Sequence, residues 1–474
     1  MRIASALTLA ALLGAFPLFA QTAPLPEEAP YLDDQGEEVF GPNYQPASPT
    51  DSGTPLLVGQ PAGGAVVDQA VEAMNQQEAA RTIQPEAASP EASRSPQPMP
   101  FPLLRSVRET ANMPRWRSRP AASRSHPGPA AAPAALDQEM IVHFVYVGQG
   151  AGAIVEFPCG VTVIDTGGEY RSGDNGGKMF TAYLESFFAA RPALNRTIDV
   201  LFTSHPHKDH LFGLSLMGFG DAAGAFKIRN IVDNGQTGTE GSLAAQTKAR
   251  EAARAAGANY SAVEFANQTS ATGSTNAVID PISCPTIDPK ITAFWGSRND
   301  ALVGASAAEA RRYISPNNHS VVVRIDFGKA SLLFMGDLQQ EGIDDMLTEY
   351  EDNLSAFDVD VLHVSHHGAE NGMSDRLIEV TSPRIAILSM GDRSSTAAST
   401  AFDHGHPRLS TIALMQKQPE IVSSRRSPKT FWGAEKEETP FKDVVIRRAI
   451  YGTGWEGTLR LKAKADGTYR FVKP

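Results

Sequence analysis

Cysteine and positive charge are both scarce in this chain of 474 residues, which contains only two cysteines, Cys159 and Cys284. Their spacing does not fit a metal site, so a zinc ribbon or zinc finger is excluded. In an oxidising compartment the two thiols would form a disulfide, and two separately buried thiols are the alternative. There are 42 Lys and Arg residues against 53 Asp and Glu residues. No basic face is evident, which weakens but does not exclude a nucleic-acid substrate.

Long apolar runs are absent beyond the first twenty residues. Residues 3–20 are apolar, follow Met1-Arg2 and end in small residues. This pattern predicts a secretory signal peptide over residues 1–20, and hence a periplasmic or secreted protein. A membrane anchor is the alternative, but the run is short and contains Pro17. No later stretch approaches spanning length, so we expect no integral membrane domain.

Residues 21–136 are poor in aromatic and β-branched side chains and rich in Pro, Ala, Ser, Gln and Glu. Such a segment buries too little apolar surface to offset its chain entropy, so we expect a disordered stalk. Its basic stretch 105–124 either contacts an anionic surface such as the cell envelope or is a solvated spacer. Residues 137–474 are expected to form one folded domain, long enough to bury a large core.

Strand and helix patterns alternate along that domain. The predicted strands are 141–147, 153–157, 161–165, 198–204, 227–232, 290–295, 320–327, 331–335, 359–364, 384–389, 457–463 and 468–472, and the predicted helices are 178–190, 242–256, 339–350, 375–380 and 409–417. This order indicates a layered α/β domain, and the opening run of strands favours two packed sheets. The irregular stretches 234–241, 267–282 and 393–404 are expected to be loops around a site.

A dense group of metal-binding residue types follows the buried strand predicted at 198–204. The group comprises His205, His207, Asp209 and His210. A solvated His-rich loop is the alternative, but such a loop would lie in a polar tract. Imidazoles and carboxylates suit Zn²⁺, and also Mn²⁺ or Fe²⁺. Four ligands so close in sequence cannot easily face one ion, so we predict two divalent ions. His205 and His207 would face the first ion, and Asp209 and His210 would face the second.

Polar residues also follow two later strands. Asp337 comes after the strand 331–335, and His366 and His367 come after the strand 359–364. Because strand ends converge at one edge of a layered sheet, we predict that Asp337 bridges the two ions. One of the two histidines would close the second ion's ligand set, with His366 the first choice. The other would orient a ligand or contact the substrate.

Two further histidines, His404 and His406, lie in a loop that can reach the same cleft. One of them would bind the leaving group or a substrate phosphate. The alternative is a loop histidine that packs on Pro407. We name His406 as the candidate that takes part in catalysis.

These residues occur in motifs that resemble the metallo-β-lactamase superfamily. The shared motifs are Asp165-Thr166-Gly167, His205-x-His207-x-Asp209-His210, Gly336-Asp337 and His366-His367-Gly368. Three more are similar to the ComEC-type branch, named for the extracellular domain of a DNA-uptake competence protein: Gly148-Gln149-Gly150, Asn317-Asn318 and Gly405-His406-Pro407. The resemblance covers roughly residues 139–474. It implies a four-layer αββα sandwich with the metals at one edge and Asp165 buried beneath them.

The chain departs from this pattern at two places. Ala151 stands where the branch usually has an acidic residue. Many members of the superfamily also carry a further histidine ligand one strand before the Gly-Asp, and the nearest residues here are Asn318, His319 and Ser320. If His319 points away, the first ion has only three protein ligands and is more weakly bound or more open.

The ligand set predicts a hydrolase in which a hydroxide held between two metal ions attacks carbonyl carbon or phosphorus. The residues expected to take part in catalysis are Asp209, His366, His367 and His406. The resemblance implies a phosphodiesterase or nuclease, since its branch handles nucleic acid or phosphocholine esters. A carboxylic ester, lactone or β-lactam hydrolase is the second possibility. A non-catalytic envelope-binding module is the third, and the complete ligand set argues against it.

Overall fold

The computed structural model describes residues 138–168, 176–220, 224–265, 272–298, 311–419 and 421–472. The expected signal peptide 1–20, the stalk 21–136 and its basic stretch 105–124 lie outside the described residues. Among the helices that are described, none combines the length and the hydropathy needed to cross a lipid bilayer.

Eight strands form the first sheet, in the order β18-β17-β1-β2-β3-β5-β7-β8. Their bounds are β1 (Glu139–Phe144), β2 (Gly152–Phe157), β3 (Gly160–Thr166), β5 (Val200–Phe202), β7 (Asn230–Asp233), β8 (Asn259–Ala262), β17 (Leu459–Lys464) and β18 (Tyr469–Val472). The strands β1, β2 and β3 pair antiparallel, whereas β3, β5, β7 and β8 are parallel. The carboxyl ends of the parallel strands therefore lie at one edge of this sheet.

Six strands form the second sheet, in the order β16-β13-β12-β11-β10-β9. Their bounds are β9 (Lys290–Trp295), β10 (Val322–Phe327), β11 (Ala330–Phe334), β12 (Val361–His363), β13 (Ile385–Leu388) and β16 (Ile450–Gly452). Here β11, β12, β13 and β16 are parallel. A separate hairpin is formed by β14 (Ser424–Gly433) and β15 (Lys442–Arg448), and the short strands β4 (Thr197–Ile198) and β6 (Lys227–Ile228) pair with each other.

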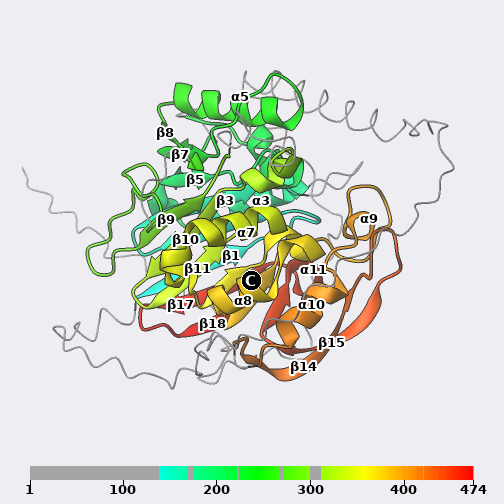
Figure 1. The fold of residues 1–474 in the computed structure, drawn as a ribbon. Helices are drawn as coiled ribbons and strands as arrows, with labels where there is room; N and C mark the ends of the chain where they lie inside the picture. Colours follow the sequence, from blue (N-terminus) through cyan, green and yellow to red (C-terminus); the bar gives the residue numbers. More distant parts are fainter. Residues whose placement is uncertain are drawn as a thin grey trace, which may run out of the picture.

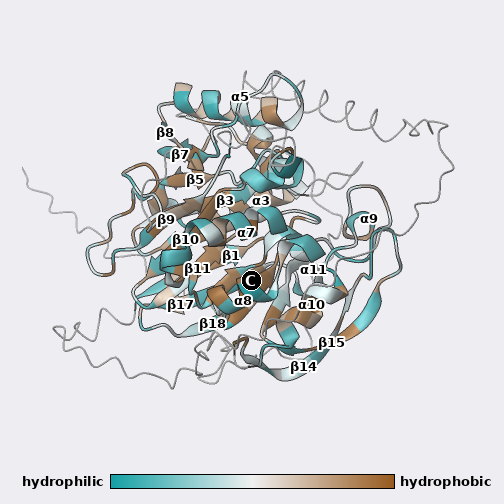
Figure 2. Ribbon diagram, in the orientation of Figure 1, coloured by the Kyte–Doolittle hydropathy of each residue, from teal (hydrophilic) through white to brown (hydrophobic). Residues whose placement is uncertain are grey.

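Helices cover the outer face of each sheet (Figure 1). On the first sheet these are α3 (Gly176–Ala189) and α5 (Gly241–Ala255), and on the second α7 (Gln340–Glu349), α8 (Asp375–Thr381) and α10 (Leu409–Gln416). The shorter helices are α4 (Lys208–Leu211), α9 (Ala401–His404) and α11 (Thr453–Glu456). Figure 2 shows apolar strands in the interior and polar stretches on the covering helices. The predicted αββα sandwich is confirmed.

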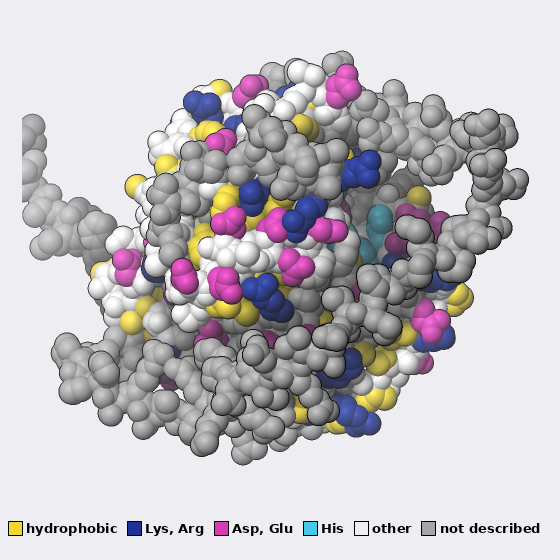
Figure 3. Space-filling view, viewed as in Figure 1, with side chains coloured by type: hydrophobic (Ala, Val, Ile, Leu, Met, Phe, Trp, Pro, Cys, Tyr) yellow, Lys and Arg dark blue, Asp and Glu magenta, His cyan; other side chains and the backbone are white. Residues whose placement is uncertain are grey.

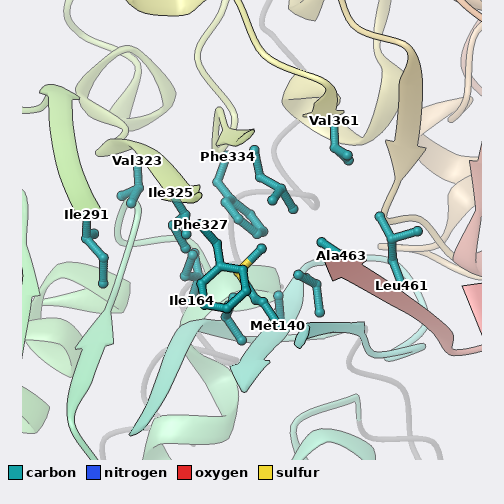
Figure 4. Packing of buried hydrophobic residues seen from close by; sticks show 14 of the residues in the cluster. Met140, Ile164, Ile291, Val323, Ile325, Phe327, Phe334, Val361, Leu461 and Ala463 are labelled. Atoms are coloured by element: carbon teal, nitrogen blue, oxygen red, sulfur yellow. The ribbon is translucent and has the colours of Figure 1, made fainter. Parts of the chain in front are cut away.

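The largest part of the core lies between the two sheets (Figure 4). Met140, Ile164 and Leu461 of the first sheet pack against side chains such as Ile325 and Phe327 of the second, and the five are at most 6% exposed. Each buried side chain of this size contributes about 2 kcal/mol relative to an exposed one. This core holds the two sheets, and hence their strand ends, in one register.

Cys159 and Cys284 form a disulfide. Cys159 lies in the turn between β2 and β3, and Cys284 lies shortly before β9, so the bond joins the two sheets. Because β3 runs from Cys159 toward Asp165, and β9 runs from Cys284 toward Trp295, the bond lies at the end of the sandwich remote from the polar strand ends described below.

Candidate metal centre

The candidate ligands follow strands from both sheets. His205, Asp209 and His210 come after β5 of the first sheet, Asp337 after β11 and His367 after β12 of the second. Gly336 makes the turn that delivers Asp337, with φ of 55°. A Cβ at this position would lie 2.9 Å from side-chain atoms of Ser204 and Ser320. Close packing of the two sheets at this edge thus requires glycine at position 336.

Four residues bring their ligand atoms within 4.8 Å of one another: Asp209, His210, Asp337 and His367. His210 Nε2 lies 3.1 Å from Asp337 Oδ1 and 3.2 Å from His367 Nε2. His367 Nε2 lies 3.1 Å from Asp209 Oδ2 and 3.2 Å from Asp337 Oδ2. We refer to these four residues as the second-ion group, because the sequence assigns Asp209 and His210 to the second of the two predicted ions.

The other predicted pair lies beside this group. His205 Nε2 is 3.0 Å from His207 Nδ1 and 3.9 Å from Asp337 Oδ2. Asp337 therefore lies close to this pair as well as to the other three residues of the second-ion group. The bridging role of Asp337 is compatible with this position and stays a prediction.

Hydrogen bonds fix which ring nitrogens face the cluster. His210 Nδ1 donates to Asp165 Oδ2 over 2.8 Å, and His367 Nδ1 donates to the Ser389 carbonyl oxygen over 2.7 Å. Since both partners are acceptors, Nε2 is the ring nitrogen that each histidine turns toward the cluster, and a bound metal ion would replace the proton there. Asp165 also accepts bonds from the Ser204 backbone and hydroxyl. As the resemblance implies, Asp165 orients a ligand from beneath the site.

The electrostatics of the cluster pair buried carboxylates with adjacent imidazoles. Burial by itself would raise the pKa of Asp337, but the adjacent His210 and His367 hold that pKa well below the usual value. Burial would lower the pKa of His367, but Asp337 and Asp209 raise it to about 10. Buried carboxylates that stay ionised need positive charge beside them. The nitrogen and oxygen donors present fit divalent metal ions.

Of the two adjacent histidines, the structure brings His367 rather than His366 into the second-ion group. Both residues have left-handed backbone conformations, with φ of 53° and 50°, which turn their side chains in different directions. His366 Nε2 lies 4.0 Å from Asp337 Oδ2, and its Nδ1 lies 2.7 Å from Asn371 Oδ1. The geometry therefore corrects our first choice of His366 as the ligand of the second ion. His366 still lines the cavity.

None of the three residues considered for a further ligand lines the cavity beside the cluster. His319 accepts a bond from the Arg298 backbone at Nδ1 and contacts the Tyr313 carbonyl oxygen through Nε2. Asn318 uses its amide on the Gln339 and Arg312 backbones. Ser320 accepts a bond from the Asp337 backbone through its hydroxyl. The residue of this segment that lines the cavity is Asn317, which the sequence analysis passed over as a ligand.

The cluster opens into a cavity of about 240 Å³, and histidine side chains gather in a hollow on the right of Figure 3. Besides the ligands, the cavity is lined by Gln149, Gly168, Lys208, Ser242, Asn317, His366, Ser399, His404 and His406. Of the predicted loops, the stretch 393–404 supplies Ser399 and His404 to the site, although its last four residues form the helix α9 and not a loop. His406, whose role was open, also faces the cavity.

Gln149 holds His406 in one orientation. The Gly391 backbone donates to Gln149 Oε1 over 3.2 Å, so the amide nitrogen of Gln149 faces His406 Nδ1, at 3.0 Å. Burial and neighbouring imidazoles keep the pKa of His406 well below its usual value. His406 is therefore a neutral imidazole that accepts at Nδ1 and carries its proton on Nε2. The Gly-Gln-Gly turn is visible in the sequence, whereas the contact of Gln149 with His406 depends on the folded structure.

Comparison with known proteins identifies the family. The profile of the metallo-beta-lactamase superfamily matches residues 146–392, more than half of the chain. The chain belongs to the metallo-beta-lactamase superfamily. It is 30% identical over 109 residues to ComE operon protein 3 of Bacillus subtilis, which is 23% of this chain and 12% of that protein. It is 35% identical over 81 residues to competence protein ComA of Neisseria gonorrhoeae, 17% of this chain and 11% of that protein.

These matches agree with the ComEC-type resemblance, although the chain spans only about an eighth or less of the length of these two relatives. Among solved structures, the metallo-beta-lactamase fold protein YhfI of Bacillus subtilis is similar with a TM-score of 0.31 and 11% identity. That match covers 69% of this chain and 98% of YhfI. A short-form human tRNase Z is similar with a TM-score of 0.28 and 12% identity. That match covers 52% of this chain and 92% of the tRNase.

Proposed function

We propose that this chain is an exported hydrolase that uses two divalent metal ions to cleave phosphodiester bonds in nucleic-acid-type substrates. The observation that carries the proposal is the position of Asp337 close to both the His205–His207 pair and the other three residues of the second-ion group. When bound, two such ions would supply Lewis acidity, which activates water and stabilises negative charge on a substrate oxygen.

The protein's own residues take separate roles in this scheme. His205 and His207 would hold the first ion, and Asp209, His210 and His367 would hold the second. Asp337 would be available to either ion. In this scheme Asp165 and the Ser389 carbonyl oxygen keep the imidazoles turned toward the ions, because each fixes a proton on the far ring nitrogen.

The cavity wall favours an anionic substrate. Lys208 and His406 present hydrogen-bond donors around the cluster. A phosphodiester offers two anionic oxygens to such donors, whereas a carboxylic ester offers one neutral carbonyl. A volume of about 240 Å³ accommodates the reacting group and not a whole polymer. Relatives named competence protein ComA and recombination protein 2 also favour a nucleic acid.

A hydrolase panel on the full chain tests this proposal. We expect hydrolysis of bis-p-nitrophenyl phosphate and of DNA or RNA, and no hydrolysis of a lactone or nitrocefin. His207→Ala should lose bound metal and at least about a thousandfold in kcat/KM, because a metal ligand is removed. His143→Gln is the matched control, since His143 is a buried histidine that contacts Tyr183 outside the cluster.

The outcomes of the panel separate the candidate functions. Hydrolysis of a lactone or nitrocefin without phosphodiester cleavage would overturn the substrate class and support the carboxylic ester alternative. A protein that binds metal but hydrolyses nothing in the panel would support the binding module. Activity that survives in His207→Ala would contradict the metal centre itself.

Export is supported by two features of the chain. Residues 3–20 have the pattern of a signal peptide, and Cys159 and Cys284 form a disulfide, a bond that persists in oxidising compartments. Residues 1–136 fused to alkaline phosphatase, an enzyme that is active only outside the cytoplasm, should give active reporter in a Gram-negative host. An inactive fusion that accumulates in the cytoplasm would contradict export.

A further inference from the structure

The first-ion position has fewer protein ligands than the second. His205, His207 and Asp337 converge there, whereas four residues form the second-ion group. A protein-bound divalent ion usually takes at least four ligands. A buried polar atom next to this position that has no partner in the protein would be a candidate for the missing contact.

Asn317 provides such an atom in the wall of the same cavity, because its amide lies 3.3 Å from His366 Nε2, which is 4.0 Å from Asp337 Oδ2. Its side chain lines the cavity, and the residue is only 5% exposed. Asn317 Oδ1 is buried and has no hydrogen-bond partner among the described residues. A buried carbonyl oxygen without a partner costs about 1–3 kcal/mol. An unpartnered buried oxygen of this kind indicates a partner outside the protein, for example a bound ion.

The neighbouring histidine determines which way the Asn317 amide points. His366 Nδ1 donates to Asn371 Oδ1 over 2.7 Å, so in the neutral ring Nε2 is an acceptor. The Asn317 amide nitrogen lies 3.3 Å from that Nε2. Only an NH₂ group can donate to it, so the oxygen of Asn317 is the atom that remains for the cavity.

The backbone around Asn317 is held in place by contacts with both sheets. Trp295 Nε1 donates to the Asn318 carbonyl oxygen over 3.0 Å, and the Asn234 amide donates to the His319 carbonyl oxygen over 3.2 Å. The side chains of Asn318, His319 and Ser320 are already bonded elsewhere. The segment is therefore fixed with Asn317 at the cavity wall.

We propose that the side-chain oxygen of Asn317 is a ligand of the first metal ion, in the place where many members of the superfamily use a histidine. An amide oxygen is a harder ligand than an imidazole, so this site should bind Mn²⁺ relatively better, and Zn²⁺ less tightly, than a site with a third histidine. The inference rests on the proposed two-ion centre and is independent of the substrate.

Metal binding by the full chain tests the assignment without any activity measurement. Wild type, Asn317→Leu and Asn317→Asp are each saturated with Mn²⁺ or Zn²⁺ and desalted, and the ions per chain are counted by mass spectrometry. We expect two equivalents for wild type and for Asn317→Asp, which keeps the oxygen. Asn317→Leu, which has nearly the same shape, should fall to one. Asn317→His should raise the affinity for Zn²⁺ relative to Mn²⁺ by about tenfold or more.

Asn371→Leu is the matched control, because Asn371 contacts the other nitrogen of the same His366 and should keep two equivalents. Equal loss in Asn317→Leu and Asn371→Leu would overturn the proposal, since the effect would then pass through His366. Two bound ions per chain in Asn317→Leu with unchanged affinity would also overturn the proposal, and so would one bound ion per chain in wild type.

Circular dichroism shows whether Asn317→Leu is folded. If it is misfolded, the loss of one bound ion per chain in Asn317→Asp overturns the proposal. Two equivalents without hydrolysis would contradict the proposed function alone.

Discussion

Single hydrogen bonds decide the chemistry of His406. Gln149 accepts from the Gly391 backbone at one end of its amide, so its other end must donate to His406 Nδ1. The proton of the neutral imidazole is then on Nε2, where it can be donated to a substrate oxygen. In this arrangement Gln149 is a positioning residue, and it acts only through His406.

Gln149→Glu tests that arrangement. The carboxylate keeps the acceptor for Gly391 but cannot donate, so the His406 proton should move to Nδ1. We expect kcat on a phosphodiester to fall by about ten- to a hundredfold with little change in metal content. Nitrogen NMR of the imidazole reports the proton's position directly. An unchanged tautomer, or a tautomer change without a change in kcat, would contradict the role.

Asp280 should make the stability of the protein depend on pH. Partial burial raises the pKa of Asp280 to about 6, and its Oδ1 has no hydrogen-bond partner among the described residues. The unfolded value is about 3.9. Because the folded pKa is the higher one, the contribution of Asp280 to stability is fully present below about pH 3.9 and is lost as pH rises through about 6.

Asp280→Asn should therefore stabilise the protein by about 1 kcal/mol at pH 8 and leave its stability unchanged near pH 3.5, after allowance for partial solvent screening. Denaturant unfolding at the two pH values measures the difference. A variant that is less stable than wild type at pH 8 would show that the ionised carboxylate makes a favourable contact.

The sequence predicts some ligands better than others. His205, His207, Asp209 and His210 are adjacent in sequence, so one buried strand end brings them together. The choice between His366 and His367 depends on two left-handed residues in a turn, and no local pattern encodes these. Asn317 became visible as a candidate only when the bonds of its neighbours were known.

At the scale of elements, most strands with buried apolar runs were predicted, whereas the short strands β8 and β16 and the strands with charged faces were missed. The hairpin of β14 and β15 was not predicted, because charged residues and a register shift between Ser424 and Lys429 obscure its alternation. Tertiary contacts stabilise it instead. Arg425 lies 4.2 Å above the Tyr451 ring and forms an ion pair with Glu456. Such contacts are not visible in a local sequence pattern.

The disulfide should contribute to stability and not to the site. It closes a loop between residues 125 apart in sequence, at the end remote from the metal ligands. The double variant Cys159→Ala/Cys284→Ala should lose about 2–5 kcal/mol of unfolding free energy, because the unfolded chain is no longer constrained. Metal content should stay the same. Loss of bound metal at a temperature where the variant is folded would contradict this separation.

At the scale of the whole molecule, the candidate ligands come from two different sheets. Residues after β5 belong to one half of the sandwich, and Asp337 and His367 belong to the other. Bound ions would therefore connect the halves. At about a hundredfold excess over the dissociation constant they should add about 2.7 kcal/mol to the stability. Calorimetry before and after chelation measures this, and an unchanged melting temperature would contradict it.

The two ends of the sandwich are thus closed by different means, a covalent bond at one end and exchangeable ions at the other. Chelation should increase amide hydrogen exchange first in the turns at 204–210 and 336–338, while β9 and the turn at 158–160 stay protected. A chelated molecule would still have its halves tethered in register. Returning the ions should then restore the original protection within seconds, with no need for the chain to refold.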